Sequence, residues 1–438
     1  MRRPVILLIV FGLVELVRPL GSTGYGAQAL LTFGFLLLAA YTVGEIAASI
    51  GIPAIVGYMA AGAAFGPWGL ASVSREAVAR LVPVSDLAIA LIAFLAGAEL
   101  RWQEVRDRGV ALLKVVGTEL LLGAVALGTT LYAAHDFVPF LRDLPRSELL
   151  AVVVLFASVA VVHSPAVTMA LLTDTGARGP VARTTLGVVL ITDVVVVLLF
   201  TGALTVARSL VPIAGAEGPS FGVVAWEIAG ALLVGGGLGG AAALYLRFVG
   251  EELFLFALLF TLLGAEVAHL AHVEALLTLL VAGFIAENVS PHGSGEALRR
   301  AMERSAAPVF VVFFGLSGAQ MDLSAVLRLL PLLLPLALVR GGALWAGTRV
   351  GSRWAGIGDP ERRLLWLGLV SQAGVAIGLA SVLAGVFPSF GGELRTLLLA
   401  FIALNQTIGP VLFRRALVQG GEIAPQVRSP VPGETVGS

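Results

Sequence analysis

Cysteine is absent from the 438 residues of this sequence. The chain therefore forms no disulfide and offers no thiolate nucleophile and no Cys-ligated metal site. Charged residues are scarce, at 13%, and the 28 Lys and Arg balance the 28 Asp and Glu. A net charge of zero creates no overall field that would attract nucleic acid or an acidic partner. No Walker motif occurs, so the sequence offers no P-loop for the phosphates of ATP.

The sequence is instead rich in long apolar stretches. Hydrophobic residues make up 58% of the chain, and the mean hydropathy is +0.96. Apolar stretches of about 17 to 25 residues, each long enough to cross the hydrocarbon as a helix, recur from end to end. They predict an all-α polytopic membrane protein with fourteen spans, near residues 4–20, 27–48, 52–66, 84–100, 109–133, 148–173, 181–207, 222–246, 252–270, 272–287, 305–321, 327–348, 362–386 and 394–417.

The positive charges predict the orientation of these spans. With both termini in the cytoplasm, most of the Lys and Arg residues fall in cytoplasmic loops, as the positive-inside rule requires. We expect a multi-pass protein of the inner cell membrane. The first span follows Met1-Arg2-Arg3 like a signal sequence, but no A-x-A cleavage site follows it, so we interpret it as an uncleaved helix.

Two short motifs recur at a constant distance. Ala61-Gly62 in YMAAGAAFGP reappears as Ala282-Gly283 in LLVAGFIAENVSP, and LAGAEL at 95–100 reappears as LSGAQM at 316–321, both 221 residues later. Seven predicted spans separate each pair, so the copies run in opposite directions through the membrane. The predicted organisation is therefore an inverted six-helix repeat, with an extra N-terminal helix at 1–26, a first repeat at 27–208, a linking helix at 209–250, a second repeat at 251–418 and a cytoplasmic tail at 419–438.

Transporter sites form where interrupted helices of two inverted repeats meet, so interruptions are informative. In the span 148–173, Pro165 removes a backbone donor and disfavours helix at the preceding Ser164. In the span 362–386, the segment SQAGVAIG at 371–378 places polar and glycine residues in an apolar helix. Lipid cannot satisfy the backbone groups freed there, so both breaks must face protein or water.

Each interrupted span is followed by one that carries a polar pair. The pair is Thr192-Asp193 in the first repeat and Asn405-Gln406 in the second, so only the first keeps a carboxylate. An acid inside the membrane marks a functional site by default. Hard monovalent cations prefer oxygen ligands. The predicted ion and proton ligands are Asp193, Thr192, Ser164 and His163, together with main-chain carbonyls of the second interrupted helix at Ser371, Gln372 and Gly374.

Several segments together carry a family resemblance: HSPAVTMALLTDTGARGP, TLGVVLITDVVVVLLF, GIPAIVGYMAAGAAFGP, FLAGAEL, LVAGFIAEN, VSQAGVAIGLA and IGPVLFRRAL. Over about residues 41–417 the chain resembles the monovalent cation:proton antiporter-2 family, the Kef-type exchangers with a Na⁺/H⁺ antiporter-like fold. The resemblance implies a homodimer with thirteen helices, a dimerisation part and a core part that moves like an elevator. It assigns the cation or the proton to Asp193, and Arg340 matches a basic residue of the pattern. Thr192 departs from the Asp, Asn or Gln usual before the acid, and the extra N-terminal helix departs from thirteen.

One buried acid is sufficient for exchange. A sodium or potassium ion stabilises ionised Asp193, whereas a proton removes the charge that holds the ion, so the two ligands exclude each other. We therefore expect a secondary antiporter, not an enzyme, without a cofactor and with no metal beyond the transported cation. A single titratable site favours electroneutral exchange. The alternatives are a gated cation channel and an organic-anion symporter, which would need carbonyl rings or several donors at the breaks.

Other polar residues have structural interpretations beside the functional ones. Arg340 is predicted to neutralise a carboxylate or a half-helix C-terminus, and a purely structural pair with Asp193 is the alternative. His163 is either a proton shuttle or a satisfied histidine beside a break. Glu99 and Glu119 are interpreted as snorkelling or structurally paired. Two further groups are assigned no binding role: His269, His272 and Glu274, interpreted as a surface turn, and GGGLGG at 235–240, interpreted as a helix-packing surface.

Overall fold

A computed structural model describes residues 25–211, 221–290 and 294–423, and the regular secondary structure of this part of the chain is all helical. Every predicted span from 27–48 onward coincides with one helix or with one broken pair of helices, whereas the predicted span 4–20 lies outside the described residues. The helices are α2 (Tyr25–Ser49), α3 (Ala54–Phe65), α4 (Arg75–Arg80), α5 (Val82–Glu99), α6 (Trp102–Ala133), α7 (Pro139–Arg142), α8 (Arg146–Ala160), α9 (Pro165–Thr175), α10 (Pro180–Leu210), α11 (Phe221–Phe248), α12 (Leu253–Leu270), α13 (Ala275–Val289), α14 (Ser294–Ala319), α15 (Leu323–Ala355), α16 (Glu361–Gly368), α17 (Val375–Val386) and α18 (Gly391–Gln419).

Several helices are longer than the hydrophobic stretches that predicted them. Helix α6 begins at Trp102, α14 begins at Ser294 and α15 ends at Ala355, several residues beyond the predicted spans. Hydropathy detects only the part of a helix that lies in hydrocarbon, and the helices continue into the polar region. Among the described residues, six helical segments of at least 18 residues have the length and hydropathy of a membrane span, and shorter apolar helices accompany them.

The outer surface of the molecule is apolar. Leu233 on α11, Leu327 and Leu338 on α15 and Leu270 at the end of α12 are each about two thirds exposed or more. In water such a surface would drive aggregation, whereas in a bilayer it contacts lipid chains. The exposed leucines therefore support the assignment of a multi-pass membrane protein.

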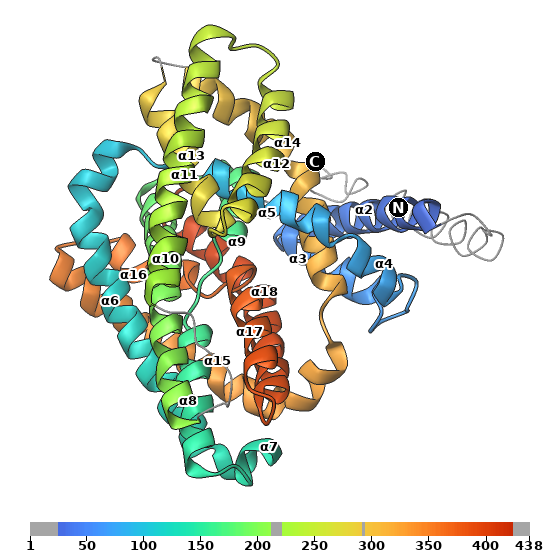
Figure 1. The fold of residues 1–438 in the computed structure, drawn as a ribbon, viewed down its shortest axis with the longest axis vertical. Helices are drawn as coiled ribbons and strands as arrows, with labels where there is room; N and C mark the ends of the chain where they lie inside the picture. Colours follow the sequence, from blue (N-terminus) through green and yellow to red (C-terminus); the bar gives the residue numbers. More distant parts are fainter. Residues whose placement is uncertain (1–24, 212–220, 291–293, 424–438) are drawn as a thin grey trace, which may run out of the picture.

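The helices form two bundles. Helices α6, α8, α10, α15, α16, α17 and α18 pack mainly on one another, and we call them, together with α9, the crossing bundle. Helix α9 continues the chain beyond the first break and packs on helices of both bundles. Helices α2 to α5 and α11 to α14 form the second, which we call the flanking bundle. In Figure 1, α6 and α16 of the crossing bundle lie on the left, and α2, α3 and α4 of the flanking bundle lie on the right. The interface between the bundles includes contacts of α9 with α5 and of α18 with α3.

Close glycine contacts reveal the inverted repeat in three dimensions. A Cβ at Gly62 of α3 would collide with the Gly315 carbonyl of α14, and a Cβ at Gly283 of α13 would collide with the Phe94 carbonyl of α5. Each residue of the first contact lies 221 positions from its counterpart in the second. In each repeat, the helix with the first motif therefore packs against the helix with the second motif of the other repeat: α3 packs on α14, and α13 packs on α5. The predicted fold class of inverted repeats with two interrupted helices is confirmed, while the exact segment boundaries stay a prediction.

Two helices of the crossing bundle are interrupted at the predicted places. The first break follows Ala160 and ends at Ser164, whose hydroxyl accepts a hydrogen bond from Val167 N at 3.2 Å. Pro165 occupies the first turn of α9, where its missing N–H costs no helical hydrogen bond. Sequence therefore located this break to within a few residues.

The second break is displaced from its predicted position. The chain leaves α16 at Gly368 and resumes helix at Val375, so the last four residues of the predicted segment 371–378 are helical. Gly374, with φ at +38°, precedes the first turn of α17. This left-handed backbone favours glycine, which explains why α17 starts directly after it. The apolar residues that follow then continue the helix.

Candidate functional site

Arg340 of α15 joins the two breaks. Its Nε donates to Ala160 O at 2.9 Å and its Nη2 to Val162 O at 3.0 Å, at the first break. Its Nη1 donates to Val370 O at 2.6 Å and its Nη2 to Leu369 O at 3.2 Å, at the second. These carbonyls lie at the C-terminal ends of α8 and α16, where the helix dipoles place negative partial charge. The predicted role at a half-helix C-terminus is therefore found at both half-helices.

A histidine connects Arg340 to a buried carboxylate. His163 Nδ1 lies 3.3 Å from Arg340 Nη2, and His163 Nε2 lies 3.0 Å from Glu119 Oε1 of α6. Because guanidinium has no acceptor, Nδ1 must accept and Nε2 must carry the proton that it donates to Glu119. The imidazole is thus neutral, and Glu119 balances the charge of Arg340. All three side chains are fully or almost fully buried.

The hydrogen bonds of the Arg340 side chain do not include Asp193. Its guanidinium forms its polar contacts with carbonyls and His163, and its carboxylate counterpart is Glu119. The structural pairing expected for Glu119 is present, although the sequence did not identify the partner. The signal available in the sequence was an acid within an apolar span, which indicates that other groups of the protein surround and pair with it.

Asp193 has no such partner. It lies on α10, is only 6% exposed, and neither of its carboxylate oxygens has a hydrogen-bond partner. Thr192 Oγ1 and Ser371 Oγ are also buried without a partner. Buried polar atoms are hydrogen-bonded in most proteins, so unsatisfied oxygens require an explanation such as an ion site. Both carboxylate oxygens of Asp193 are thus unpaired, whereas Glu119 has one unpaired oxygen, Oε2, and one bonded to His163.

The other predicted ligands have structural partners. The Ser164 hydroxyl caps α9, and both ring nitrogens of His163 are engaged, as the interpretation of a satisfied histidine expected. Gln372 Nε2 donates to Ala160 O at 3.0 Å, which makes a further link between the breaks. Among the side chains of the predicted ligands, those of Asp193, Thr192 and Ser371 thus keep buried oxygens without a hydrogen-bond partner. Their role as ion ligands stays a prediction.

Both amide nitrogens of the polar pair in the second repeat donate hydrogen bonds. Asn405 Nδ2 donates to Gln372 Oε1 at 3.0 Å, and Gln406 Nε2 donates to Ser317 Oγ at 2.8 Å. Gln406 belongs to α18 of the crossing bundle, whereas Ser317 belongs to α14 of the flanking bundle. A second bond between the bundles runs from Arg414 Nη1 of α18 to Gly51 O, at 3.3 Å.

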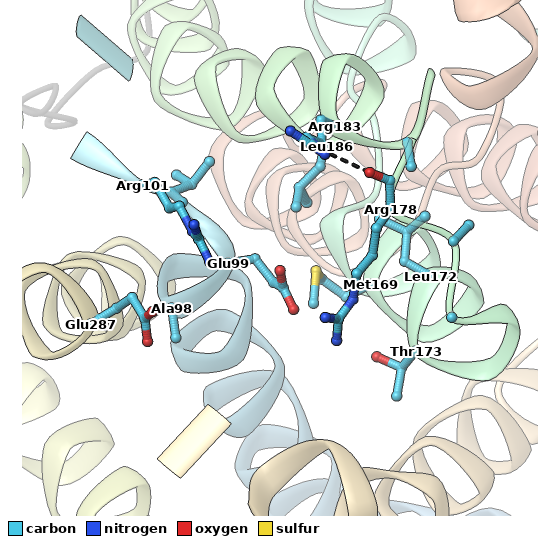
Figure 2. Close-up of a pocket in the computed structure, with 14 residues that line it drawn as sticks. Ala98, Glu99, Arg101, Met169, Leu172, Thr173, Arg178, Arg183, Leu186 and Glu287 are labelled. Atoms are coloured by element: carbon cyan, nitrogen blue, oxygen red, sulfur yellow. Dashed lines mark hydrogen bonds between the residues drawn. The ribbon is translucent and has the colours of Figure 1, made fainter. Parts of the chain in front are cut away.

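A cavity lies between the bundles where α5 and α13 end and α9 meets α10. It measures about 220 Å³ and includes Met169, Leu186 and Glu287 in its lining. In Figure 2, Glu99 of α5 and Arg178 of the α9–α10 turn point toward each other across it. Leu186 lies seven residues before Asp193 on the same helix, which is about 10 Å of helical rise. The cavity thus approaches the acid without reaching it.

The structure places two sequence groups that received no binding role: GGGLGG at 235–240, and His269, His272 and Glu274. Gly235 of α11 lies against Thr278 O and Gly239 against Ala282 O, so one face of GGGLGG lets α11 approach α13 closely. His269 and His272 are exposed, and the described residues contain no group of three His, Cys, Asp or Glu suited to a metal ion. The surface interpretation was wrong for Glu274, which is half-buried and whose carboxylate caps α13.

Inverted repeats, two interrupted helices that meet, and a buried acid without a partner define a secondary transporter. The sequence model of the family described as "Sodium/hydrogen exchanger, transmembrane" matches residues 34–418. The chain belongs to this family. The predicted resemblance to monovalent cation:proton antiporters is confirmed, and so is the prediction of cation/proton antiport at the level of the family.

Solved structures show the same fold. The chain is similar to the sodium proton antiporter MjNhaP1 from Methanocaldococcus jannaschii at pH 8, with a TM-score of 0.65, 16% sequence identity, and coverage of 90% of this chain and 97% of that chain. An electron-microscopy map of the same antiporter gives a TM-score of 0.70, 14% identity, and coverage of 91% and 97%. At these identities the likeness concerns the fold.

Proposed function

We propose that the protein exchanges Na⁺ or K⁺ for H⁺ at Asp193. The observation that carries this proposal is the contrast between two buried acids: Glu119 is tied to Arg340 through His163, while both oxygens of Asp193 are free. An ionised carboxylate in a dry site must be compensated by a cation or a proton. Because one carboxylate holds one of them at a time, binding of either ligand releases the other.

The charges of the crossing bundle favour electroneutral exchange. With His163 neutral, Glu119 and Arg340 cancel each other. Asp193 is neutralised both when it binds a proton and when it binds one monovalent cation. Both loaded forms of this site are therefore uncharged, and an imposed membrane voltage should leave the exchange rate unchanged. A clear dependence of flux on voltage would contradict the proposed stoichiometry.

The movement that we propose is an elevator-like displacement of the crossing bundle against the flanking bundle. Arg340 and Gln372 hold both breaks within one bundle, so the site can move as a unit.

We assign the cavity of Figure 2 to the entrance from the cytoplasm, because Arg101, Arg178 and Arg183 gather there, as the positive-inside rule expects. Both termini are then cytoplasmic, and the protein lies in the inner membrane as a homodimer. It requires no resident cofactor.

Proteoliposomes test the proposed site. With a pH gradient, the wild-type protein should release protons as it takes up Na⁺ or K⁺, and Asp193→Asn should reduce this flux to background while the protein folds normally. A variant that retains cation-dependent proton release would remove Asp193 from the mechanism. Measurement with each cation in turn identifies the transported ion.

The absence of cysteine allows a direct test of the movement. In the double variant Ser317→Cys, Gln406→Cys, a bifunctional methanethiosulfonate reagent would join the two bundles where a hydrogen bond joins them now, because its spacer replaces the length of the lost side chains. We expect cross-linking to stop exchange and reduction, which cleaves the cross-link, to restore it. The control is Arg108→Cys, Glu361→Cys, which replaces an ion pair within the crossing bundle. If the cross-link between the bundles forms and flux continues, the bundles do not move against each other.

A further inference from the structure

A second cavity lies where α15 ends and α16 begins, and arginines surround it. It measures about 180 Å³, and we call it the arginine cavity. Its lining consists of Arg349 and Arg353 of α15, Arg362 and Arg363 of α16, and Asp359 between the two helices. Its volume is about ten times the roughly 10–15 Å³ that a cavity needs to hold one water molecule. There is therefore room for a phosphate group.

Most of the positive charge at the arginine cavity has no counter-charge in the protein. Asp359 forms an ion pair with Arg362 at 3.5 Å. Within the described part of the chain, Arg349, Arg353 and Arg363 form no ion pair. The Nε of Arg349 is also buried without a hydrogen-bond acceptor. A buried donor needs an acceptor, and clustered cations repel one another, so this cavity is suited to an anion.

The arginine cavity lies at the depth of the lipid headgroups. Arg349 follows Arg340 by nine residues on α15, which is about 13 Å of helical rise. Arg340 contacts both breaks, and interrupted helices of transporters meet near the middle of the membrane. Half of the hydrocarbon thickness is about 15 Å. Arg349 therefore comes to the boundary between hydrocarbon and headgroups, where a lipid phosphate lies.

The face of α15 that carries Arg349 continues into the hydrocarbon. Leu338, Trp345 and Arg349 follow one another at helical spacing, and the first two are exposed. The Arg349 guanidinium lies over the Trp345 ring, 4.7 Å from its centroid. Tryptophan is enriched at the edges of the membrane, and an exposed leucine in the hydrocarbon contacts acyl chains. One helix face thus leads from the acyl chains of the bilayer to the arginines.

We propose that an anionic glycerophospholipid binds here, with its phosphate in the arginine cavity and an acyl chain along Leu338 and Trp345. Guanidinium groups bind phosphate oxygens in a bidentate manner. Glu361 at the start of α16 pairs with Arg108, so it does not neutralise the cavity, and the excess positive charge favours a headgroup with a net negative charge. Because the arginines come from α15 and α16, the bound phosphate joins these two helices and stabilises the segment that leads to the second break.

Lipid titration of the purified full-length protein tests this site. The protein is stripped of lipid in a neutral detergent, and phosphatidylglycerol, phosphatidylcholine or inorganic phosphate is added. Native mass spectrometry counts bound lipid, and thermal unfolding reports stabilisation. We expect phosphatidylglycerol to bind and to raise the unfolding temperature. Phosphatidylcholine, which has no net charge, should bind at least fivefold more weakly, and inorganic phosphate at the same concentration should have no effect.

Substitutions at the exposed arginines assign the binding to this cavity. Arg353 and Arg363 are exposed, so glutamine at either position leaves the fold intact. Arg353→Gln should weaken the binding of phosphatidylglycerol about fivefold, and Arg363→Gln in addition should weaken it by about the same factor again. The control is Arg328→Gln, which removes an exposed arginine from the opposite end of α15 and should bind the lipid like the wild type.

Three results would overturn this inference. Equal binding of phosphatidylglycerol by the wild type and the double variant would place the lipid elsewhere. Inorganic phosphate that stabilises the protein as much as phosphatidylglycerol does would identify a site for a soluble anion instead. Equal binding of phosphatidylcholine would show that the net charge of the lipid does not matter. None of these measurements depends on transport, so they stand apart from the test of Asp193.

Discussion

The two repeats place a polar pair at corresponding positions and use it differently. In α10, Asp193 and Thr192 have side-chain oxygens without partners, whereas in α18 both Asn405 and Gln406 donate to other side chains. The polar pair of the first repeat thus keeps oxygens available for a ligand, whereas the polar pair of the second repeat bonds to neighbouring side chains and holds helices together. Two repeats with the same fold can therefore place different chemical groups at corresponding positions.

The largest effect on stability should come from the acid that is engaged. We expect Glu119→Leu to lower the free energy of unfolding by about 3–5 kcal/mol, because it leaves Arg340 buried without a counter-charge. Asp193→Asn should leave stability unchanged or higher, since it removes an uncompensated acid. Thermal unfolding in detergent measures both. Equal destabilisation by the two changes would contradict the contrast between a structural and a functional acid.

A smaller effect should appear at the glycines that relate the repeats. Gly62→Ala and Gly283→Ala each push a methyl group into a backbone carbonyl of the opposite motif helix. Overpacking of this kind costs about 1–3 kcal/mol. Because the two contacts are equivalent, the two losses of stability should be similar. Gly236→Ala, where nothing lies within 4 Å, is the control and should be neutral.

A substitution in the polar pair of the second repeat should lower the stability of the protein more than it changes ion exchange. Asn405→Leu leaves the buried Gln372 Oε1 without its donor, which costs about 1–3 kcal/mol. Exchange per folded molecule, measured in proteoliposomes after correction for the amount of folded protein, should stay close to wild type. A loss of transport as complete as that of Asp193→Asn would show that the second repeat takes part in ion binding.

The smallest effect is expected for a change that keeps the hydrogen bonds of His163. In His163→Gln, the amide oxygen can accept from Arg340 and the amide nitrogen can donate to Glu119, but the residue no longer titrates. The pH profile of exchange should therefore keep its shape. If one limb of the profile disappears in this variant, His163 carries a proton and the network is not purely structural.

The sequence alone was sufficient to locate the helices and Asp193, because each produces a signal in a short stretch of sequence. Length and hydropathy located the spans, Pro165 located the first break, and Asp193 stood out as a charge in an apolar helix. The sequence placed the second break a few residues too late, since a glycine in an apolar stretch does not show at which residue the helix ends. The partner of Arg340 was not foreseen either. Glu119, His163 and Arg340 lie on three separate helices, and no local pattern records their approach.

The capping of α10 has a consequence for the end of the chain. Glu422, just beyond α18, accepts hydrogen bonds from Val181 N at 2.6 Å and Ala182 N at 3.0 Å, at the start of the helix that carries Asp193. A carboxylate at a helix N-terminus is favoured by the dipole and satisfies orphan donors. Protein engineers who shorten this protein, or attach a fluorescent reporter to it, should therefore cut or fuse beyond Glu422, because an earlier junction would remove the cap of the helix that carries Asp193.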